Sequence, residues 1–563
     1  MGDQKNLLLA ILVSLVVLLG FQLLFPNEQK PNKQIENKSL ENNEVSQPFP
    51  NVIEEKERSR EEVISESKRI NINNSFISGS LSLSGARIDD LILKNYFEDL
   101  STDSDYVKLL SPKNTMNSYF AEHGWVKNNN SNIIIPDSKT VWDADTSELN
   151  PNSPVTLTWD NNNGIIFKKV ITVDKEYMFE ITQTVINNSN EHITLYPYGI
   201  INRTGIPKMS GLYILHEGPI AVLNERLKEI DYDDLIDNNK ISEKSKNGWI
   251  GITDKYWLTA LIPNQKKEFE GHFQSFNNDS KIKFQTSYLG SSVTINSNSQ
   301  SSYLSKLYLG AKVVSILDQH EKTGIAMFDR SVDFGWFYVI TKPLFYLLSF
   351  FSNLFGNVGL AIIALTICIR IVLFPLANKS FKSMNKMKLL QPKMMEIRER
   401  YGNDKIQMQK EVMALYKKEK ANPLAGCLPI LLQIPVFFAL YKVLSVTIEM
   451  RQAPFYGWIK DLSAPDPYSI FNLFGLIPID LPSFLIIGIW PLIMGGTMLL
   501  QQKLNPAPPD PIQAKVMGML PFIFIFLFAQ FAAGLVIYWT CNNALSIIQQ
   551  WVIMKKMDKT NTS

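Results

Sequence analysis

The apolar residues of this chain are distributed unevenly, and that distribution limits what the chain can fold into. An uncharged run of 19 residues, 7–25, opens the sequence, and the part after about residue 335 contains four further long apolar blocks. An α-helix rises about 1.5 Å per residue, so runs of this length suit the ~30 Å hydrocarbon core of a bilayer. The region between them is polar and rich in Asn and Ser. The sequence therefore predicts membrane helices before and after a large polar domain.

Charge and composition exclude several classes of function. The chain has 563 residues, which predicts two or three folded units, and 56 basic against 54 acidic residues give a net charge of +2. A net charge this close to zero gives no strong positive electrostatic potential of the kind that indicates a nucleic-acid partner. All five histidines lie in the polar middle, so the apolar part has no histidine for metal or general-base chemistry. We expect no metal, no cofactor and, because all three cysteines lie in apolar runs, no disulfide framework.

The polar middle divides into a linker and a β domain. Residues 26–68 are almost purely Asn, Glu, Lys, Gln and Ser, which predicts a disordered linker after an N-terminal anchor at 1–25, for which a cleaved signal peptide is the alternative. Apolar and polar residues alternate on both sides of Asp160–Gly164, a pattern typical of a β-hairpin, and the alternation returns in 179–200. We therefore predict an all-β sandwich domain over 69–332.

After Asp333 apolar blocks alternate with polar loops. The predicted segments are an interfacial amphipathic helix at 333–357, a transmembrane helix at 358–377, a cytoplasmic helical hairpin at 378–423, a transmembrane helix at 424–445, an external loop at 446–482, a transmembrane helix at 483–500, a cytoplasmic loop at 501–515, a transmembrane helical hairpin at 516–552 and a cytoplasmic tail at 553–563. The last apolar run is too long for one crossing, and small and polar residues at 530–534 offer a turn. With the anchor, this predicts six crossings of an α-helical integral membrane protein.

The loops predict the orientation. Residues 378–420 contain 12 Lys and Arg against 5 Asp and Glu, whereas 446–482 is poor in basic residues. Basic loops stay in the cytoplasm, so the first loop is expected inside and the second outside. Counting crossings then places the β domain outside and both termini in the cytoplasm.

One arginine, Arg370, interrupts the apolar run LTICIRIVLFPL. A charge near the middle of a bilayer helix costs about 2.5–3.5 kcal/mol on insertion scales. No predicted span after residue 335 contains Asp or Glu, which excludes an ion pair within them. Arg370 either snorkels to the headgroups or faces a hydrated pocket.

Neutral polar residues on three spans lie at about the depth of Arg370. These residues are Thr366, Gln433, Asn542 and Asn543. Polar side chains inside spans face a bundle interior or a water-filled cavity, so they predict a hydrated pocket open toward the cytoplasm. Ordinary hydrogen bonds between helices are the competing interpretation for Gln433 and the two asparagines.

Two further patterns concern apolar contacts. Met387, Met394 and Met408 lie at helical spacing in the cytoplasmic hairpin, which indicates either packing between its arms or a flexible face for apolar clients. The aromatic pairs Phe437–Phe438 and Tyr538–Trp539 lie in two spans, where they face either lipid or a passing apolar segment.

The stretches ANPLAGCLPILLQIPVFFALYKVL, RQAPFYGWIKDLSAPDPY and AGLVIYWTCNNALSIIQQ resemble the YidC/Oxa/Alb family of membrane protein insertases. The resemblance covers about 333–555 closely, and the anchor and external domain match in layout. It implies a five-helix insertase core plus the anchor, an external domain with a supersandwich fold in the periplasm, and a place in the bacterial inner membrane.

The resemblance also implies roles for the residues above. Arg370 occupies the place of the family's groove arginine, and Phe437, Phe438, Tyr538 and Trp539 correspond to a hydrophobic slide, with Trp539 replacing a second tyrosine. The implied function is a non-enzymatic insertase and chaperone for nascent membrane proteins, acting alone or with the Sec translocon. Its other implied partners are membrane lipids and the ribosome, which would use the cytoplasmic loops because the carboxyl tail is short.

Three other classes of protein fit the sequence less well. A channel or secondary transporter also uses polar groups at mid-depth but is commonly built from inverted repeats, and the sequence has no internal repeat. A membrane-anchored glycan enzyme would need paired carboxylates or a histidine outside, and the acidic residues there show no pattern that nominates a pair. An intramembrane protease would need Asp or His in the spans, and neither is present.

Overall fold

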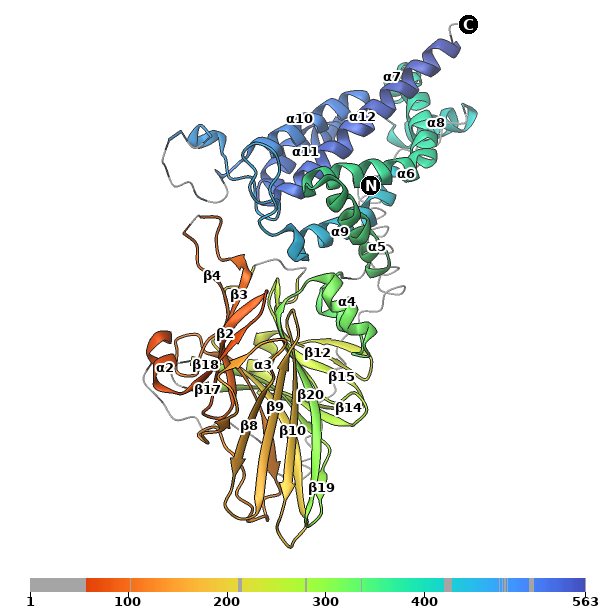
Figure 1. The fold of residues 1–563 in the computed structure, drawn as a ribbon. Helices are drawn as coiled ribbons and strands as arrows, with labels where there is room; N and C mark the ends of the chain where they lie inside the picture. The colour runs from red at the N-terminus through yellow and green to blue at the C-terminus, as the bar shows by residue number, and fades with distance from the viewer. Residues whose placement is uncertain are drawn as a thin grey trace. The chain divides into compact units, whose positions relative to one another are not determined.

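The structure is a computed structural model that describes residues 57–101, 103–210, 215–278, 281–335, 337–402, 404–419, 428–474, 476–477, 479, 482, 485–505 and 511–561. The described residues form two units, a β unit and a helical unit (Figure 1). The β unit runs to Pro343 and also includes Tyr441–Ala453, whereas the helical unit contains Leu344–Leu440 and the residues from Pro454 onward. The predicted anchor at 1–25 and most of the predicted linker lie outside the described residues.

The β unit is built from two large sheets of mostly antiparallel strands. The first sheet has the order β14-β17-β18-β11-β5-β3-β2-β1-β7, with β19 beside β11 and β4 beside β3. Its strands are β1 (Arg69–Asn73), β2 (Ile77–Ser82), β3 (Arg87–Phe97), β4 (Tyr106–Leu110), β5 (Tyr119–Lys127), β7 (Glu148–Leu149), β11 (Ile193–Thr204), β14 (Lys240–Ser245), β17 (Phe269–Asn278), β18 (Lys281–Gly290) and β19 (Val293–Ile295).

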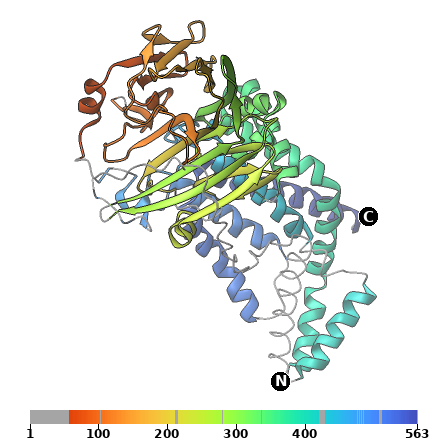
Figure 2. The same ribbon diagram turned by 90° about the horizontal axis from the view of Figure 1, so that it is seen from below.

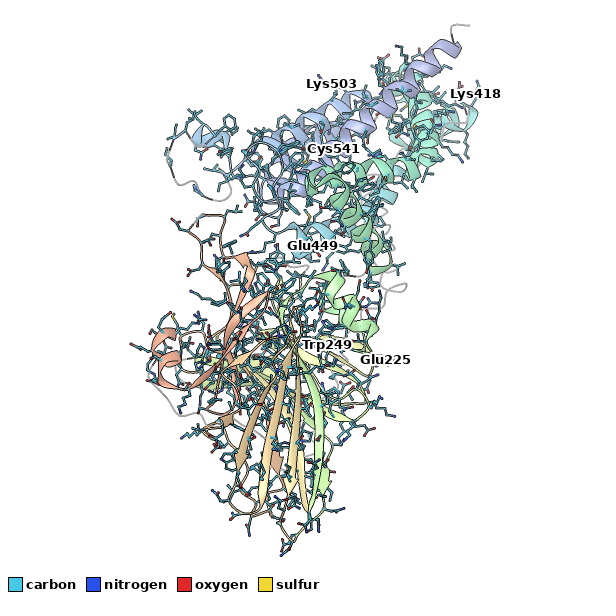
Figure 3. All side chains as sticks on the ribbon, viewed as in Figure 1. Glu225, Trp249, Lys418, Glu449, Lys503 and Cys541 are labelled. Carbon is cyan, nitrogen blue, oxygen red and sulfur yellow. The ribbon has the colours of Figure 1, made fainter. Side chains whose placement is uncertain are left out.

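The second sheet has the order β13-β12-β15-β16-β20-β10-β9-β8-β6. Its strands are β6 (Asp143–Ala144), β8 (Val155–Asp160), β9 (Ile165–Val173), β10 (Met178–Asn187), β12 (Gly218–Leu223), β13 (Arg226–Glu229), β15 (Gly248–Thr253), β16 (Trp257–Ile262) and β20 (Ser299–Ala311). Short helices accompany the sheets, among them α3 (Tyr232–Asn238), α4 (Val314–Lys322) and the 3₁₀ helix η1 (Phe328–Ser331). Large side chains such as Trp249 are fully buried in this unit (Figure 3).

The predicted hairpin around Asp160–Gly164 is present. Asp160 at the end of β8 pairs with Ile166 of β9, and the turn places Asn162 at φ +57° and Gly164 at φ +81°. Asn and Gly tolerate these left-handed angles better than other residues, which is why this sequence turns here. Alternate residues of β9 are buried, as the period of two requires.

The second alternating stretch, 179–200, does not form a hairpin. Its first half is β10 and its second half begins β11, and these strands belong to different sheets. β10 pairs instead with β9 and β20, and β11 pairs with β5 and β18. The Asn- and Ser-rich residues between them therefore carry the chain from one sheet of the sandwich to the other.

One part of the predicted linker is a helix rather than disordered chain. Helix α2 (Arg60–Glu66) begins at a capping box, in which the Ser59 hydroxyl accepts from the Glu62 amide and the Glu62 carboxylate accepts from the Ser59 amide. Arg60 forms an ion pair with Asp90 of β3. The prediction for 26–68 is thus wrong for these residues, because a local cap and a charge partner in the β unit stabilise them.

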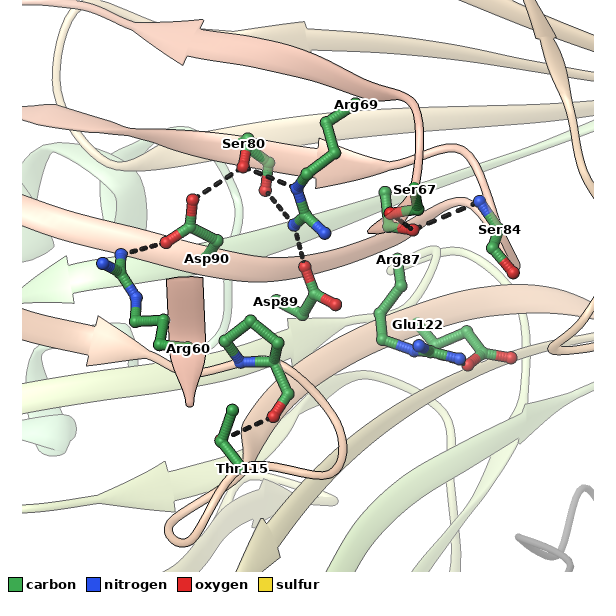
Figure 4. Close-up of polar contacts among 12 residues, drawn as sticks. Arg60, Ser67, Arg69, Ser80, Ser84, Arg87, Asp89, Asp90, Thr115 and Glu122 are labelled. Atoms are coloured by element: carbon green, nitrogen blue, oxygen red, sulfur yellow. Dashed lines mark hydrogen bonds and ion pairs between the residues drawn. The ribbon is translucent and has the colours of Figure 1, made fainter. Parts of the chain in front are cut away.

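Further polar contacts join the first strands of the β unit (Figure 4). Arg69 of β1 pairs with Asp89 of β3, and its Nε donates to the Ser80 Oγ of β2 at 2.7 Å. The Ser80 hydroxyl in turn donates to the Asp90 Oδ2 at 2.6 Å. Since Asp89 and Asp90 are both buried, these bonds compensate the loss of water around two carboxylates.

The helical unit contains the apolar blocks of the sequence. Its helices are α6 (Val358–Leu389), α7 (Gln391–Tyr401), α8 (Lys405–Lys418), α10 (Ile489–Leu504), α11 (Pro511–Phe528) and α12 (Ala533–Asn561), while α5 (Tyr338–Phe355) and α9 (Leu428–Val446) begin or end in the β unit. A short 3₁₀ helix occurs at Ile470–Asn472 in this unit, and another, Ile448–Met450, belongs to the β unit. α12 packs against α6 and α10, and α10 packs against α11 (Figures 1 and 2).

The helix ends differ from the predicted span ends. Among the described residues, α6 alone is long and apolar enough to cross a membrane by length and composition, and shorter apolar stretches occur in α9 and α11. α6 does not stop at residue 377 but continues to Leu389 through the Lys- and Ser-containing sequence, because these residues permit a helix in water as well as in lipid. The helix direction changes at Leu390, and Pro392 lies in the first turn of α7, where proline is tolerated.

Candidate functional site

Helix α6 carries Arg370 into the interior of the helical unit. The helix begins at an Asn357 cap, whose side-chain oxygen accepts the Leu360 amide at 3.0 Å. Arg370 follows Val358 by 12 residues, or roughly 18 Å of helix. Its side chain reaches α12, where Nε donates to the Asn542 Oδ1 at 2.8 Å and Nη2 donates to the Asn542 main-chain oxygen at 3.0 Å. Nη2 also donates to the Ser546 hydroxyl.

Two other polar pairs connect helices near Arg370. The Gln433 side-chain amide of α9 donates to the Tyr538 hydroxyl of α12. The Asn543 Nδ2 of α12 donates to the Thr497 Oγ1 of α10 at 3.2 Å. These are the interhelical hydrogen bonds that the sequence left open as an interpretation, and they coexist with a cavity.

The cavity has a volume of about 350 Å³ and lies among α6, α9, α10, α11 and α12. We call it the groove. Its polar lining consists of Arg370, Gln433, Gln501, Gln502, Asn505, Asn542, Asn543 and Ser546. Among the described residues of this lining, Arg370 carries the only charge. The groove therefore offers one cation surrounded by amides, which can both donate and accept hydrogen bonds.

The apolar wall of the groove is aromatic. Phe437 of α9 lies edge-on to Trp539 of α12, with ring centroids 4.9 Å apart, and Phe524 of α11 completes the lining. Phe528 of α11 stands behind them, 5.2 Å from Trp539 and 6.3 Å from Phe437. Three helices thus contribute to one cluster of rings beside the polar lining.

The predicted residues do not all face the groove. Thr366 is 1% exposed, and its hydroxyl donates to the Ile362 main-chain oxygen of its own helix at 2.7 Å. Tyr538 is also buried, and it reaches the groove only through Gln433. Phe438 is 44% exposed and lies outside the groove lining, one position from Phe437 on the helix. The remaining predicted groove and slide residues, Arg370, Gln433, Asn542, Asn543, Phe437 and Trp539, come together.

Sequence reasoning missed the contribution of α10. Gln501, Gln502 and Asn505 lie at its carboxyl end, within or next to the region predicted as a cytoplasmic loop. Gln502 donates to the Met517 main-chain oxygen at 2.7 Å, so α11 holds one of them in place. The consecutive glutamines directly after an apolar run were the available signal.

The three hairpin methionines occupy different environments. Met387 packs with Phe381, Met384 and Ile553 in an apolar cluster at the end of α6. Met394 is buried as well, and the Tyr416 hydroxyl of α8 lies 3.2 Å from its sulfur. Met408 is half-buried. Contact of clients with Met387 or Met394 would thus require the hairpin to open, whereas Met408 is partly accessible.

Two lysines of the β unit, Lys169 and Lys312, are buried. Lys169 occupies an inward position of β9, between Phe167 and Ile171, and is 4% exposed. Its Nζ donates to the His123 main-chain oxygen of the other sheet at 2.5 Å and lies 4.6 Å from the centre of the Trp142 ring. Burial lowers the pKa of Lys169 to about 8, and burial followed by the nearby lysine charge lowers the pKa of His123 to about 3.

Comparison with known proteins gives matches over nearly the whole chain. Residues 69–347 match the family described as YidC periplasmic domain, and residues 350–560 match the family described as 60Kd inner membrane protein. The chain is 49% identical to the membrane protein insertase YidC of Rickettsia bellii over 98% of this chain and 99% of that protein. The insertase YidC of Rickettsia prowazekii is also 49% identical, with the same coverage of both chains.

Solved structures resemble the chain more distantly. A crystal structure of an active YidC insertase covers 86% of this chain and 92% of its own, with 15% identity and a TM-score of 0.37. A galactose mutarotase related enzyme from Lactobacillus acidophilus covers 43% of this chain and 97% of its own, with 10% identity and a TM-score of 0.29.

Proposed function

The chain belongs to the YidC family of membrane protein insertases, and from this premise we propose that it inserts proteins into the bacterial inner membrane through the groove around Arg370. The observation that carries the proposal is the groove itself, in which one arginine and several amides lie beside an aromatic wall inside an apolar helical unit. A substrate that needs both surfaces at once is a polypeptide with an apolar helix and a polar flank.

The energetics of insertion fit this arrangement. Each Leu, Ile, Phe or Val of a client helix gains about 0.3–0.6 kcal/mol by entering lipid, so the helix itself needs little help. The difficult step is the passage of its polar flank through a dry layer. Amide side chains that both donate and accept hydrogen bonds can replace water around the flank, and Arg370 attracts carboxylates in it.

The aromatic wall supplies the second half of the path. We propose that a client's apolar helix leaves the groove along Phe437 and Trp539, with Phe524 and Phe528 extending that surface. α6 and α11 expose large apolar side chains, among them Val372 at 76% and Phe526 at 56%, which suits helices surrounded by lipid. The proposed core has five crossing helices, namely α6, α9, α10, α11 and α12, in addition to the anchor at 1–25.

The proposed orientation places both termini in the cytoplasm and the β unit in the periplasm. The excess of basic residues in 378–420 supports a cytoplasmic position for α7 and α8. Contacts within the β unit support an external position for the chain that follows α9. Lys442 pairs with Asp333 at 2.7 Å, and Arg451 donates to the Phe97 main-chain oxygen. These contacts of Lys442 at the end of α9 and of Arg451 beyond it support the proposal that this end of α9 is on the same side of the membrane as the β domain.

The partners follow from the same proposal. Clients are nascent membrane proteins, which the protein receives alone or beside the Sec translocon and helps to fold as a chaperone. The basic exterior of the α7–α8 hairpin is the proposed contact for the ribosome, since ribosomal RNA is a polyanion. The proposal requires neither a cofactor nor a catalytic residue, because apolar transfer supplies the driving force.

The proposal can be tested in liposomes that contain only this protein and a client with a short acidic external tail. We expect Arg370→Ala to reduce insertion, because the groove loses its cation, and Arg370→Lys to retain most of it. Arg400→Ala, which removes an exposed arginine of α7, serves as the matched control. Equal insertion by all four proteins would contradict capture of the client by the Arg370 charge.

A further inference from the structure

A second cavity lies between α6 and α12. It has a volume of about 620 Å³, and its described lining comes from these two helices alone. This is within the usual range of about 300–1,000 Å³ for small-molecule sites. Arg370 borders both this cavity and the groove, whereas Gln433, Phe437 and Trp539 border the groove only. The second cavity is therefore not part of the path proposed for clients.

The lining residues follow the periodicity of one face on each helix. On α6, Arg370, Phe374, Asn378 and Lys382 repeat every four residues. On α12, Leu545 and Gln549 are separated by one turn, and Ile548 and Val552 by another. Residues four apart lie above one another on a helix, so the cavity is a channel that runs along the two helices.

Polarity changes along this channel. The α6 residues near Arg370 are apolar, with Ile371 66% exposed and Phe374 50% exposed. From Asn378 onward, roughly 12 Å farther along the helix, the lining becomes polar and ends at the exposed Lys382. Gln549 of α12 borders the same cavity, and its Nε2 is enclosed without a hydrogen-bond partner among the described residues. An enclosed amide donor without a partner indicates a missing acceptor.

The charge of the channel has one sign. Arg370 and Lys382 are basic, and the described lining contains no acidic side chain. Lys382 also lies in the basic stretch that begins at residue 378, with Lys379, Lys386 and Lys388 nearby in sequence. A ligand that fits must therefore combine an anionic acceptor at one end with an apolar body of about 12 Å or more.

We propose that this channel binds one anionic phospholipid. Its phosphate would accept from the Lys382 ammonium and the unpartnered Gln549 amide, and an acyl chain would lie along Phe374, Ile371 and Ile548. The cytoplasmic leaflet carries anionic lipids, and each Lys or Arg near that surface attracts them with about fivefold preference, the equivalent of about 1 kcal/mol. The proposal uses the cytoplasmic position of the end of α6 but not the role of the groove.

The test is photolabelling of the full chain in vesicles of mixed phospholipids. Two probes carry the same photoactivatable acyl chain, one on phosphatidylglycerol and one on phosphatidylcholine. Mass spectrometry then locates adducts on α6 and α12. We expect the anionic probe to label these helices several-fold more than the zwitterionic probe, with adducts near Ile371 and Ile548.

Three variants separate this site from general attraction to a basic surface. Lys382→Gln should reduce the excess labelling by about fivefold, whereas Lys379→Gln, which removes an exposed lysine outside the channel lining, should leave it unchanged. Ile371→Trp should block labelling by both probes through filling the channel. Equal labelling by the two probes, equal effects of the two lysine variants, or adducts from neither probe would each overturn the proposal.

Discussion

Arg370 of α6 donates to both the side-chain and the main-chain oxygen of Asn542 of α12, at 2.8 and 3.0 Å. The cation at the centre of the groove is thus fixed in place by neutral acceptors rather than by a carboxylate. Neutral acceptors hold the guanidinium without cancelling its charge, so the charge stays available to a client. This arrangement holds an arginine in position within an apolar run while leaving its charge uncancelled.

Replacement of Asn542 by aspartate should neutralise the charge of Arg370 while keeping the hydrogen bond between α6 and α12. Asn542→Asp places a carboxylate at hydrogen-bond distance from Arg370, so the two charges neutralise each other. We expect insertion of clients with acidic tails to fall to the level of Arg370→Ala, while clients with neutral tails are affected less. Insertion into liposomes that contain the purified protein measures both.

A second asparagine on the same helix provides the control for that experiment. Asn543 bonds to Thr497 rather than to Arg370, so Asn543→Asp adds the same charge to the groove without pairing directly with the arginine. Its effect on acidic clients should be smaller than that of Asn542→Asp. Equal losses would mean that any carboxylate in the groove repels clients and that the pairing with Arg370 is irrelevant.

The two neighbouring phenylalanines of α9 should have different partners during insertion. Phe437 lines the groove and contacts Trp539, whereas Phe438 is 44% exposed and lies outside the lining. A photoreactive phenylalanine analogue at 437 is expected to crosslink to an inserting client, and the same analogue at 438 to phospholipid. Mass analysis of the products from an arrested client distinguishes the two, and client adducts of equal yield at both positions would contradict the proposed path.

The buried Lys169 should make the β unit more stable as the solution becomes alkaline. Its pKa of about 8 in the folded state is below the usual value of about 10.4, so the unfolded chain binds more protons between these pH values. Unfolding free energy therefore rises with pH from about 8 to about 10.4 and is flat just below pH 8 as far as this group is concerned. Hydrogen exchange of β9 amides in the full chain, corrected for intrinsic rates, measures the trend.

Removal of this lysine should reduce that trend without abolishing it, because burial also lowers the pKa of Lys312 in the same unit to about 8. Lys169→Met leaves an apolar chain of similar length in the sandwich, so we expect a gain of about 1–3 kcal/mol at pH 7 and a smaller rise above pH 8, the remainder of which comes from Lys312. Lys168→Met, one residue away and facing the other side of β9, is the control. If Lys169→Met keeps the full alkaline rise seen in the wild type and in Lys168→Met, Lys169 does not contribute to it.

Two adjacent glycines of α10 should respond in opposite ways to alanine. A Cβ on Gly495 would overlap the Ile525 side chain of α11, whereas a Cβ on Gly496 would meet nothing within 4 Å. Gly495→Ala is expected to destabilise the helical unit by about 1–3 kcal/mol, because the helices must move apart. Gly496→Ala should be neutral or stabilise by up to about 1 kcal/mol through helix propensity. Thermal unfolding in detergent compares the two, and equal effects would refute close packing of α10 on α11.

Local signals in the sequence predicted local structure well. The Asp160–Gly164 turn follows from residues that accept left-handed angles, and the turn between α11 and α12 falls at 529–532, where the small and polar residues lie. Strand partners were not predictable in the same way. Alternation shows that β10 and β11 each bury one face, but it does not contain the information that they belong to different sheets.

The groove was predictable only where a polar residue contrasts with its neighbours. Gln433 and Asn542 stand out in apolar runs, whereas Gln501 and Asn505 lie where an apolar run gives way to a polar stretch, so the same chemistry gives a weaker signal there. Thr366 is the opposite case, because its polarity predicted a groove residue and the structure places it outside the groove lining. A threonine can bond to the carbonyl one turn before it, and so its presence in an apolar run does not require a cavity.

The composition of the groove has a consequence for how insertion depends on the surroundings of the cell. Its described polar lining consists of an arginine, a serine and amides, and none of these side chains gains or loses a proton between pH 5 and 9. Client capture should therefore be indifferent to acidification on either side of the membrane. Whatever sensitivity to a proton gradient an insertion reaction displays would then be a property of the client's own carboxylates.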